Sequence, residues 1–349
     1  MKLTIGMCTY DDYDGVYFTI QSILLFHSEI RDDIFFVVVD GNPDSAHGSA
    51  CHKLVSSLKN KHGHCGLYVR NTTWQSSASK NFVFEFSKTP YVLCMDCHVM
   101  VAPGAIQQLI DFYDKNPTTN DLHHGPLLDD NMIQVADRFN YIWSSNMLGQ
   151  WANEPPKTGS SDPYQIPMSG MGLFTCRKDA WLGFNRHFNG FGAEEGYIHK
   201  KFQKAGHKIY LLPWMKWIHR FSRPNGVPFK NEYIDRIRNY FIGWAELGED
   251  PTEIINYFSV ANTIKGQERA GIPVEELKQI QKECEQLVLA SGAQKGVEPN
   301  DGQDLRQEIR ALKLKITELE EKLNLSSSLP LHIVGQDTVR LKARGWPKF

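Results

Sequence analysis

Short apolar runs alternate with amphipathic segments along the first part of the chain. The apolar runs predict four buried strands, Leu3 to Thr9, Ile34 to Val39, Gly66 to Arg70 and Tyr91 to Asp96. Apolar residues at helical spacing predict the helices between and after them, at residues 16–27, 45–61, 78–87 and 103–115. This alternation is typical of βαβ units, and it predicts an α/β protein with a parallel sheet covered by helices.

The carboxyl ends of these strands carry the first candidate chemistry. Right-handed crossovers place Thr9, Asp40, Arg70 and Asp96 along one edge of the sheet, where open α/β sheets bind their ligands. Asp96 and His98 share one side by strand alternation, with Cys97 on the other. The Asp-x-His pair therefore predicts a divalent-metal site that excludes Cys97.

The pattern changes after residue 116. Residues 117–166 lack clear periodicity and are rich in turn-forming residues, so they predict a long loop over the site rather than part of the sheet. Beyond them the sequence predicts further strands and helices, at 171–176, 195–205, 208–213, 233–244 and 251–259.

The last sixty residues predict self-association. Apolar residues recur there at alternating steps of four and three: Leu305, Ile309, Leu312, Ile316, Leu319 and Leu323. This a/d seam is typical of a short coiled coil that makes the protein a homo-oligomer. The expected organisation is a catalytic domain, a helical extension, a linker, the coiled-coil helix and a basic tail, at 1–230, 231–291, 292–302, 303–325 and 326–349.

Composition narrows the class of protein. The net charge of −2 argues against binding nucleic acid or anionic membrane through a general electrostatic field. Seven cysteines in 349 residues do not indicate a disulfide framework. No apolar run reaches the roughly 20 residues of a membrane span, and the N-terminus runs directly into a strand pattern. We therefore expect a soluble, cytoplasmic protein.

Several motifs, in order, resemble glycosyltransferase family 2 and its GT-A relatives. They are Ile5 to Tyr10, Val37 to Asp44, Ala78-Ser79-Lys80-Asn81, Met95-Asp96-Cys97-His98, Phe191 to Glu195, and His219. The Asp-x-His form is similar to that of the polypeptide N-acetylgalactosaminyltransferases. The resemblance covers roughly residues 3–225 and implies a GT-A fold, with a Rossmann-like, mostly parallel sheet flanked by helices. The chain departs from the family pattern with Glu195 in place of Asp or Asn, and with lysines at 80 and 201 in place of arginine.

The resemblance implies a role for each motif. Asp96, His98 and His219 would hold Mn²⁺ or Mg²⁺, a ligand set of oxygen and imidazole that suits Mn²⁺. The implied donor-binding residues are Thr9, Tyr10, Asp11, Asp40, Lys80, Asp96 and Arg220. Two of them also have ordinary structural interpretations, because Asp40 can cap a strand-to-turn junction and Lys80 can be a solvated helix residue.

Glu194 and Glu195 are the candidate catalytic residues. In an inverting reaction Glu195 would take the proton of the attacking hydroxyl, with Glu194 beside it. In a retaining reaction neither need be a base, and the sequence leaves the stereochemistry open. The alternative is structural, because acidic residues in a first helical turn are favoured by the helix dipole alone.

The expected function is a metal-dependent transferase that moves a hexosyl or pentosyl group from a nucleotide sugar, first of all a UDP-sugar, to a hydroxyl acceptor. The acceptor stays open between a glycan, a protein, a lipid-linked sugar and a modified nucleic-acid base. The alternatives are a nucleotidyltransferase on a similar sheet, disfavoured because no Gly-rich phosphate loop follows the first strand, and an inactive assembly or binding protein. A zinc site at Cys51-His52 and His62 to Cys65 is also disfavoured, because its spacing matches no common zinc module.

Overall fold

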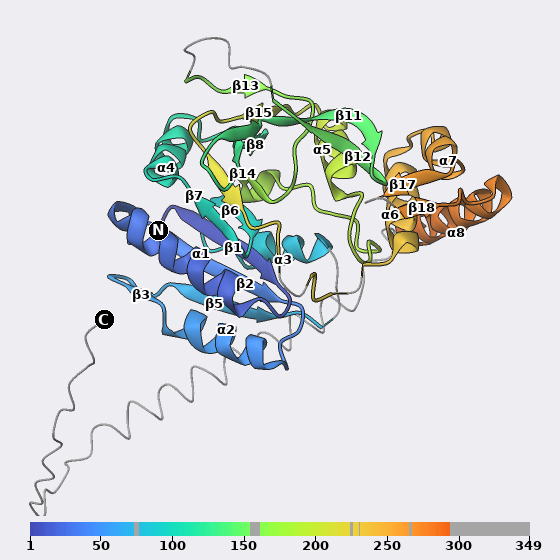
Figure 1. Ribbon diagram of the computed structural model, residues 1–349. Coiled ribbons are helices and arrows are strands. Elements are labelled where there is room, and N and C mark those ends of the chain that lie inside the picture. The colour runs from blue at the N-terminus through green and yellow to red at the C-terminus, as the bar shows by residue number, and fades with distance from the viewer. Residues whose placement is uncertain (73–76, 154–160, 224–225, 230, 265–266, 294–349) are drawn as a thin grey trace, which may run out of the picture. The chain divides into compact units, whose positions relative to one another are not determined.

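The computed structural model describes residues 1–293, except 73–76, 154–160, 224–225, 230 and 265–266 (Figure 1). The predicted coiled coil and tail, and all but the first two residues of the predicted linker, lie outside the described residues.

An eight-stranded sheet forms the centre, in the order β13-β15-β8-β14-β6-β1-β2-β5. Its parallel part contains β1 (Leu3–Thr9), β2 (Ile34–Asp40), β5 (Gly66–Arg70) and β6 (Tyr91–Asp96). Cys8 is in register with Asp96, Thr9 with Asp40, and Asp40 with Arg70. The four predicted strands and their shared carboxyl edge are confirmed.

Helices cover this sheet. They are α1 (Tyr13–Phe26), α2 (Ala46–Ser57), α3 (Lys80–Phe86) and α4 (Ala105–Lys115), and Figure 1 shows α1 beside α2. Every residue of β2 is buried, as expected for a strand packed on both faces. Gly6 of β1 faces α3, because a Cβ there would overlap the Val83 side chain. The helix predicted for 45–61 ends at Ser57, since a hairpin of β3 (Lys59–Asn60) and β4 (Gly63–His64) follows.

The segment from 117 to 166 is the main departure from the sequence prediction. It contributes β8 (Leu122–His124) and the edge strand β13 (Tyr164–Gln165) to the central sheet, next to β14 (Leu173–Arg177) and β15 (Ile209–Leu211). The prediction of a loop outside the sheet was wrong because strands of two or three residues are too short to show a period-two pattern. Two longer strands, β11 (Arg138–Ser144) and β12 (Met147–Ala152), form a hairpin in the same segment.

A second, four-stranded sheet brings distant parts of the chain together. Its order is β10 (Gln134–Ala136), β9 (Leu127–Leu128), β16 (Trp217–His219) and β7 (Val99–Val101). His219 pairs with Val99 across β16 and β7. This register sets His219 beside the turn that carries His98.

The remaining helices and strands are α5 (Glu194–Lys204), α6 (Tyr233–Leu247), α7 (Thr252–Phe258), β17 (Asn262–Ile264), β18 (Gln267–Arg269) and α8 (Val274–Ala293). Short 3₁₀ turns lie earlier in the chain, at Ser28–Ile30, Ser77–Ser79 and Lys178–Ala180. Helix α6 packs on α5 so closely that a Cβ on Gly243 would lie 2.8 Å from the Tyr197 ring. Among the described helices, none has the length and apolar character needed to cross a bilayer.

Candidate functional site

A cavity of about 870 Å³ lies at the carboxyl edge of the parallel strands. It is lined by Thr9 at the end of β1 and Tyr10 after it, by Gly41 after β2, and by Asp96 at the end of β6. The edge that the strand pattern predicted is therefore the wall of a large cavity, as expected for open α/β sheets.

Asp96, His98 and His219 meet in this wall. The Nε2 atom of His219 lies 3.2 Å from Asp96 Oδ2 and 3.2 Å from His98 Nε2. The three ligand atoms all lie within 4.8 Å of one another. The structure thus brings together the three residues that the sequence proposed as metal ligands, although His98 and His219 are 121 positions apart.

The donor set fits a divalent metal ion. One carboxylate oxygen and two imidazole nitrogens converge on one point, with Asp96 and both histidines only partly exposed. His98 Nε2 accepts a hydrogen bond from Arg223 Nη2 at 2.8 Å, so a metal ion that binds Nε2 would take the place of this guanidinium contact. Neutral imidazole and ionised carboxylate are the forms that bind metal.

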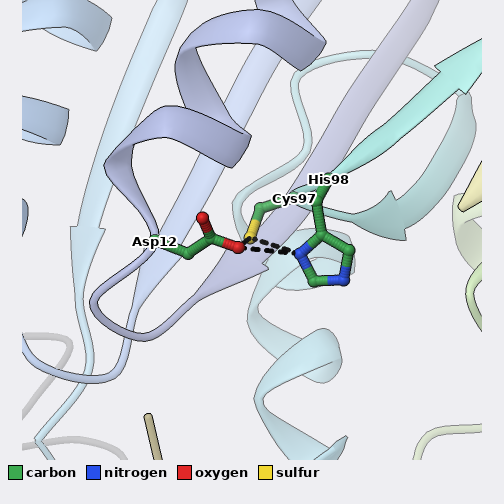
Figure 2. A group of neighbouring side chains, drawn as sticks. All are labelled: Asp12, Cys97 and His98. Atoms are coloured by element: carbon green, nitrogen blue, oxygen red, sulfur yellow. Dashed lines mark hydrogen bonds and ion pairs between the residues drawn. The ribbon is translucent and has the colours of Figure 1, made fainter. Parts of the chain in front are cut away.

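Asp12 contacts the Nδ1 side of the His98 ring, as Figure 2 shows. Its Oδ2 lies 2.9 Å from His98 Nδ1, and Arg220 Nη2 donates to both Asp12 oxygens at 2.7 Å. Asp12 also caps α1 by accepting from the Gly15 N–H. The sequence interpretation did not identify Asp12. It named the neighbouring Asp11 as a donor-binding residue; Asp11 accepts from Asn42 Nδ2 and is not among the lining residues of the cavity, and its donor contact stays a prediction.

Cys97 lies on the same side as His98, contrary to the sequence prediction. Its Sγ is 3.7 Å from Asp12 Oδ2 and 3.5 Å from His98 Nδ1 (Figure 2). The alternation of a strand does not apply, because β6 ends at Asp96 and Cys97 lies in the following turn. Asp12, Cys97 and His98 form a second group of possible ligands that shares one imidazole with the first.

Lys80 forms a buried ion pair with Asp96. Its Nζ lies 3.0 Å from Asp96 Oδ1 and donates to the Met171 carbonyl at 2.6 Å. Burial lowers the pKa of Lys80, but Asp96 together with the nearby Cys94 and Cys8 outweighs burial and raises that pKa above its ordinary value. Burial raises the pKa of Asp96, but Lys80 and the hydrogen bond from His219 outweigh it, so the net pKa is lowered. Lys80 is therefore not a solvated helix residue, and Asp96 is ionised at neutral pH.

The same balance sets the charge states of Asp12 and His98. Burial raises the pKa of Asp12, but hydrogen bonds from His98 and Arg220 outweigh it and lower that pKa below its ordinary value. Burial lowers the pKa of His98, and Asp12 offsets this only in part. His98 is thus a neutral imidazole that donates from Nδ1 to an ionised Asp12.

Asp40 is placed as a structural cap. It is 1% exposed, and its oxygens accept from the Asn42 N–H at 2.8 Å and from the Tyr68 hydroxyl at 2.7 Å. Burial raises the pKa of Asp40. Its neighbours Val39 and Gly41 line the cavity, but Asp40 does not. The contact with a nucleotide base stays a prediction.

Glu194 and Glu195 line the cavity from the first turn of α5. They are 3% and 7% exposed. Glu194 accepts from Ser77 Oγ at 2.7 Å through Oε1, while its buried Oε2 has no hydrogen-bond partner among the described residues. Burial, and then the charge of Glu194, raises the pKa of Glu195 above its ordinary value. Neither carboxylate is a solvated helix-start residue.

The β11–β12 hairpin adds a wall that the sequence interpretation missed. Phe139, Met147, Gln150 and Trp151 line the cavity, and so does Phe191 ahead of α5. The only feature of the sequence that could have indicated this wall was the concentration of aromatic residues in the hairpin segment. Within the described chain, the groups of possible metal ligands do not include Cys51 or Cys65, so the disfavoured zinc site finds no support.

Comparison with known proteins agrees with this fold. Residues 4–131 match the model of the family described as glycosyl transferase family 2. The chain is similar to the solved structure of GalNAc-T7 with UDP, GalNAc and Mn²⁺, with a TM-score of 0.58 and 15% identity. That match covers 81% of this chain and 54% of the other, so the chain spans about half the length of that relative.

Weaker similarity extends to TarS of S. aureus, with a TM-score of 0.45, 11% identity, and coverage of 81% of this chain and 43% of TarS. Among curated protein sequences no match is found. The protein has a GT-A fold and resembles the family 2 glycosyltransferases and the polypeptide N-acetylgalactosaminyltransferases.

Proposed function

We propose that the protein is a metal-dependent glycosyltransferase that moves a sugar from a nucleotide-sugar donor, a UDP-sugar, to a hydroxyl acceptor. The observation that carries the proposal is the convergence of Asp96 Oδ2, His98 Nε2 and His219 Nε2 within 4.8 Å in the wall of the large cavity. Two findings support it: the family match over residues 4–131, and the UDP and Mn²⁺ in the similar GalNAc-T7 structure.

In this proposal, the end of the cavity that contains Asp96, His98 and His219, called the metal end below, binds the departing diphosphate. A bound divalent ion such as Mn²⁺, which tolerates mixed oxygen and imidazole ligands, would neutralise the charge that develops on the leaving group. Asp12 orients His98, so that Nε2 faces the site. Lys80 keeps Asp96 ionised, and Arg223 presents a guanidinium beside His98. Cations fixed at this position stabilise negative charge without reorganising during the reaction.

The carboxylates of α5 serve the acceptor. For an inverting transfer, Glu195 takes the proton from the attacking hydroxyl, and its raised pKa makes it a better base than an ordinary carboxylate. Glu194 Oε2, which has no hydrogen-bond partner among the described residues, serves as an acceptor for a substrate hydroxyl. Burial of both groups keeps bulk water away from the reacting atoms.

A donor screen tests this function. UDP-sugars and GDP-sugars are incubated with the full chain, with and without Mn²⁺, and nucleotide release is measured. We expect metal-stimulated release from a UDP-sugar, and loss of that stimulation in Asp96→Ala and His219→Ala with folding intact by circular dichroism. His64→Ala, on the exposed β3–β4 hairpin, is the matched control.

If metal-stimulated release is undiminished in both Asp96→Ala and His219→Ala, these residues are not the metal ligands. Calorimetric titration of UDP with Mn²⁺ separates the alternatives, because an inert assembly protein should bind neither. Self-association through residues 303–325 stays a separate prediction, tested by comparing the mass in solution of the full chain and of a chain ending at 302.

A further inference from the structure

The part of the cavity formed by the β11–β12 hairpin has a different chemistry from the metal end. The hairpin contributes only uncharged side chains to the lining: Phe139, Ser144, Ser145, Met147, Gln150 and Trp151. At about 870 Å³, the cavity is near the upper end of the roughly 300–1,000 Å³ typical of small-molecule sites. It therefore has room for a second ligand beside a nucleotide-sugar donor.

The hairpin lies next to the candidate base. A Cβ on Gly196, directly after Glu195, would be 2.9 Å from Leu148 Cδ2, so β12 packs against the first turn of α5. This contact fixes the distance between the hairpin wall and the two carboxylates. A ligand resting on β12 therefore lies within reach of Glu194 and Glu195.

A glycine-flanked segment connects the hairpin with the metal end. A Cβ on Gly170 would lie 2.7 Å from Trp151 Cη2, and a Cβ on Gly172 would lie 3.5 Å from Asp96 Oδ2. Between them, the Met171 carbonyl accepts from Lys80 Nζ. The backbone of Gly170 and Gly172 therefore lines the cavity between Trp151 and the proposed metal ligand Asp96.

Charge is divided unequally between the two ends. The described lining of the cavity contains one lysine and one arginine, and both lie at the metal end. Lys80 pairs with Asp96 there, and Arg223 contacts His98. Near the hairpin the charged lining groups are Glu194 and Glu195. The charge of Arg236 lowers the pKa of Glu195 slightly, but Arg236 donates to the Phe191 carbonyl and to Asn231 and does not line the cavity. Among the described lining residues, a negatively charged acceptor would therefore face two buried glutamates, while Lys80 and Arg223 are already engaged by Asp96 and His98.

Trp151 offers a flat apolar face with polar groups beside it. It is 37% exposed, and its ring is held edge-on against Phe139, with centroids 4.2 Å apart. Gln150 and Ser144 add amide and hydroxyl groups. An aromatic face surrounded by a few hydrogen-bonding groups suits a ligand with one apolar face and several hydroxyls.

We propose that the acceptor is a neutral saccharide whose ring stacks on Trp151 and directs a hydroxyl at Glu195. This inference rests on the proposed glycosyltransferase function and adds the class of the acceptor. The transfer joins the acceptor oxygen to the donor's anomeric carbon, breaks the bond from that carbon to the diphosphate, and delivers the hydroxyl proton to Glu195.

The test uses the full chain, Mn²⁺ and the UDP-sugar that gives the fastest nucleotide release without an acceptor. Maltose, lactose and cellobiose are the neutral probes, and glucose 6-phosphate, a threonine-containing peptide and a DNA 12-mer are the alternatives. We expect a neutral disaccharide to stimulate release at least tenfold and to gain the mass of one sugar. Stimulation confined to the phosphorylated sugar, the peptide or the DNA would overturn the inference and leave the proposed function standing.

Two substitutions locate the binding face. Trp151→Ala is expected to raise the KM for the disaccharide at least tenfold and to lower the ratio of transfer to donor hydrolysis, while Trp151→Phe restores most of both. Phe18→Ala, at an exposed position of α1 outside the cavity lining, is the control and should change neither. An unchanged KM in Trp151→Ala would reject stacking on this ring. If the wild type neither binds UDP with Mn²⁺ nor hydrolyses any donor, the proposed function itself fails, and the acceptor proposal falls with it.

Discussion

Asp12 Oδ2 lies 2.9 Å from His98 Nδ1, although the two residues are 86 positions apart. The same carboxylate accepts from Arg220, which is 208 positions away. Asp12 therefore joins the start of α1, the turn after β6 and the segment after β16. A carboxylate behind a metal-binding imidazole fixes its tautomer and its ring orientation.

Replacing Asp12 by Asn should weaken metal binding. Asn retains an oxygen that can cap α1, but it removes the charge behind His98. Losing such a partner typically costs about 10–100-fold in metal affinity. Calorimetric titration of Mn²⁺ in the presence of UDP measures the affinity, and ¹⁵N NMR reports the tautomer of His98. Asp14→Asn, exposed in the same helix, is the control. Equal Mn²⁺ affinity in Asp12→Asn and wild type would remove Asp12 from the metal site.

The sequence alone was sufficient to propose Asp96 and His219 as site residues, but it did not identify Asp12 or Trp151. Asp96 follows an apolar run that has only one reasonable interpretation, and a family motif pointed to His219. The roles of Asp12 and Trp151 depend on contacts across the fold, which no local pattern encodes. Cys97 was misplaced because strand alternation was extended by one residue into a turn.

In the fold, too, some elements could be predicted from the sequence and others could not. β1, β2, β5 and β6 were predictable because buried parallel strands are continuous apolar runs. β8 and β13 were not, because strands of two or three residues are stabilised by the neighbours with which they pair. His219 approaches His98 only through such a pairing, between β16 and β7.

Lys80→Met should destabilise the protein. The substitution leaves Asp96 without its buried partner, and breaking such a pair costs about 3 kcal/mol at the low end of the usual range. We expect the low end because 32% of the Asp96 side chain remains exposed. Urea unfolding measures the loss, and Mn²⁺ should recover part of it, since a bound cation also compensates Asp96.

Lys204→Met is the matched control for Lys80. Lys204 pairs with Glu249 at the surface, where an ion pair contributes about 1 kcal/mol or less. If Lys80→Met unfolds at the same urea concentration as Lys204→Met, the buried pair does not stabilise the fold.

Glu195 should make stability and activity change with pH in opposite directions. Because its folded pKa is raised, the folded state holds a proton that the unfolded chain has lost, and stability falls as the pH rises above 4.5. Activity should rise over the same interval, since a general base must be deprotonated. Thermal melts and initial rates from pH 5 to pH 9 test both.

Glu195→Gln separates the two effects. The amide carries no charge to bury, so its melting temperature should change less with pH, while transfer is lost. Glu85→Gln, at an exposed position of α3, should behave like wild type. Parallel stability profiles for Glu195→Gln and wild type would show that Glu195 ionises in the folded state as freely as in the unfolded chain.

A buried pair of histidines should limit stability in acid. His199 Nδ1 lies 2.6 Å from the Glu195 carbonyl, which can only accept, so His199 carries its proton there. Its Nε2 then accepts from the Ser169 N–H, and His124 Nε2 lies 2.9 Å from the same atom. His124 Nδ1 lies 3.2 Å from the Leu173 carbonyl, which also only accepts, so a neutral His124 can donate to Leu173 or to His199 but not to both. A second proton on either ring would place a charge where both side chains are almost fully buried.

Protonation should therefore favour the unfolded chain. Burial lowers the pKa of His199 to about 4 and that of His124 well below 6.5. Between pH 6.5 and pH 4 the unfolded chain binds more protons, so stability falls as the pH falls, by at most about 1.4 kcal/mol per pH unit for each histidine.

His124→Gln tests this pair. At pH 7.5 the variant should be less stable than wild type by about 1–3 kcal/mol, because it leaves a buried hydrogen-bond network incomplete. From pH 6.5 to pH 4.5 its unfolding free energy should decline less steeply, since one buried titrating group is gone and His123 remains in both proteins. His64→Gln on the exposed hairpin should follow wild type throughout. Urea unfolding at four pH values measures all three slopes, and equal slopes for His124→Gln and wild type would mean that the pair does not set the acid limit.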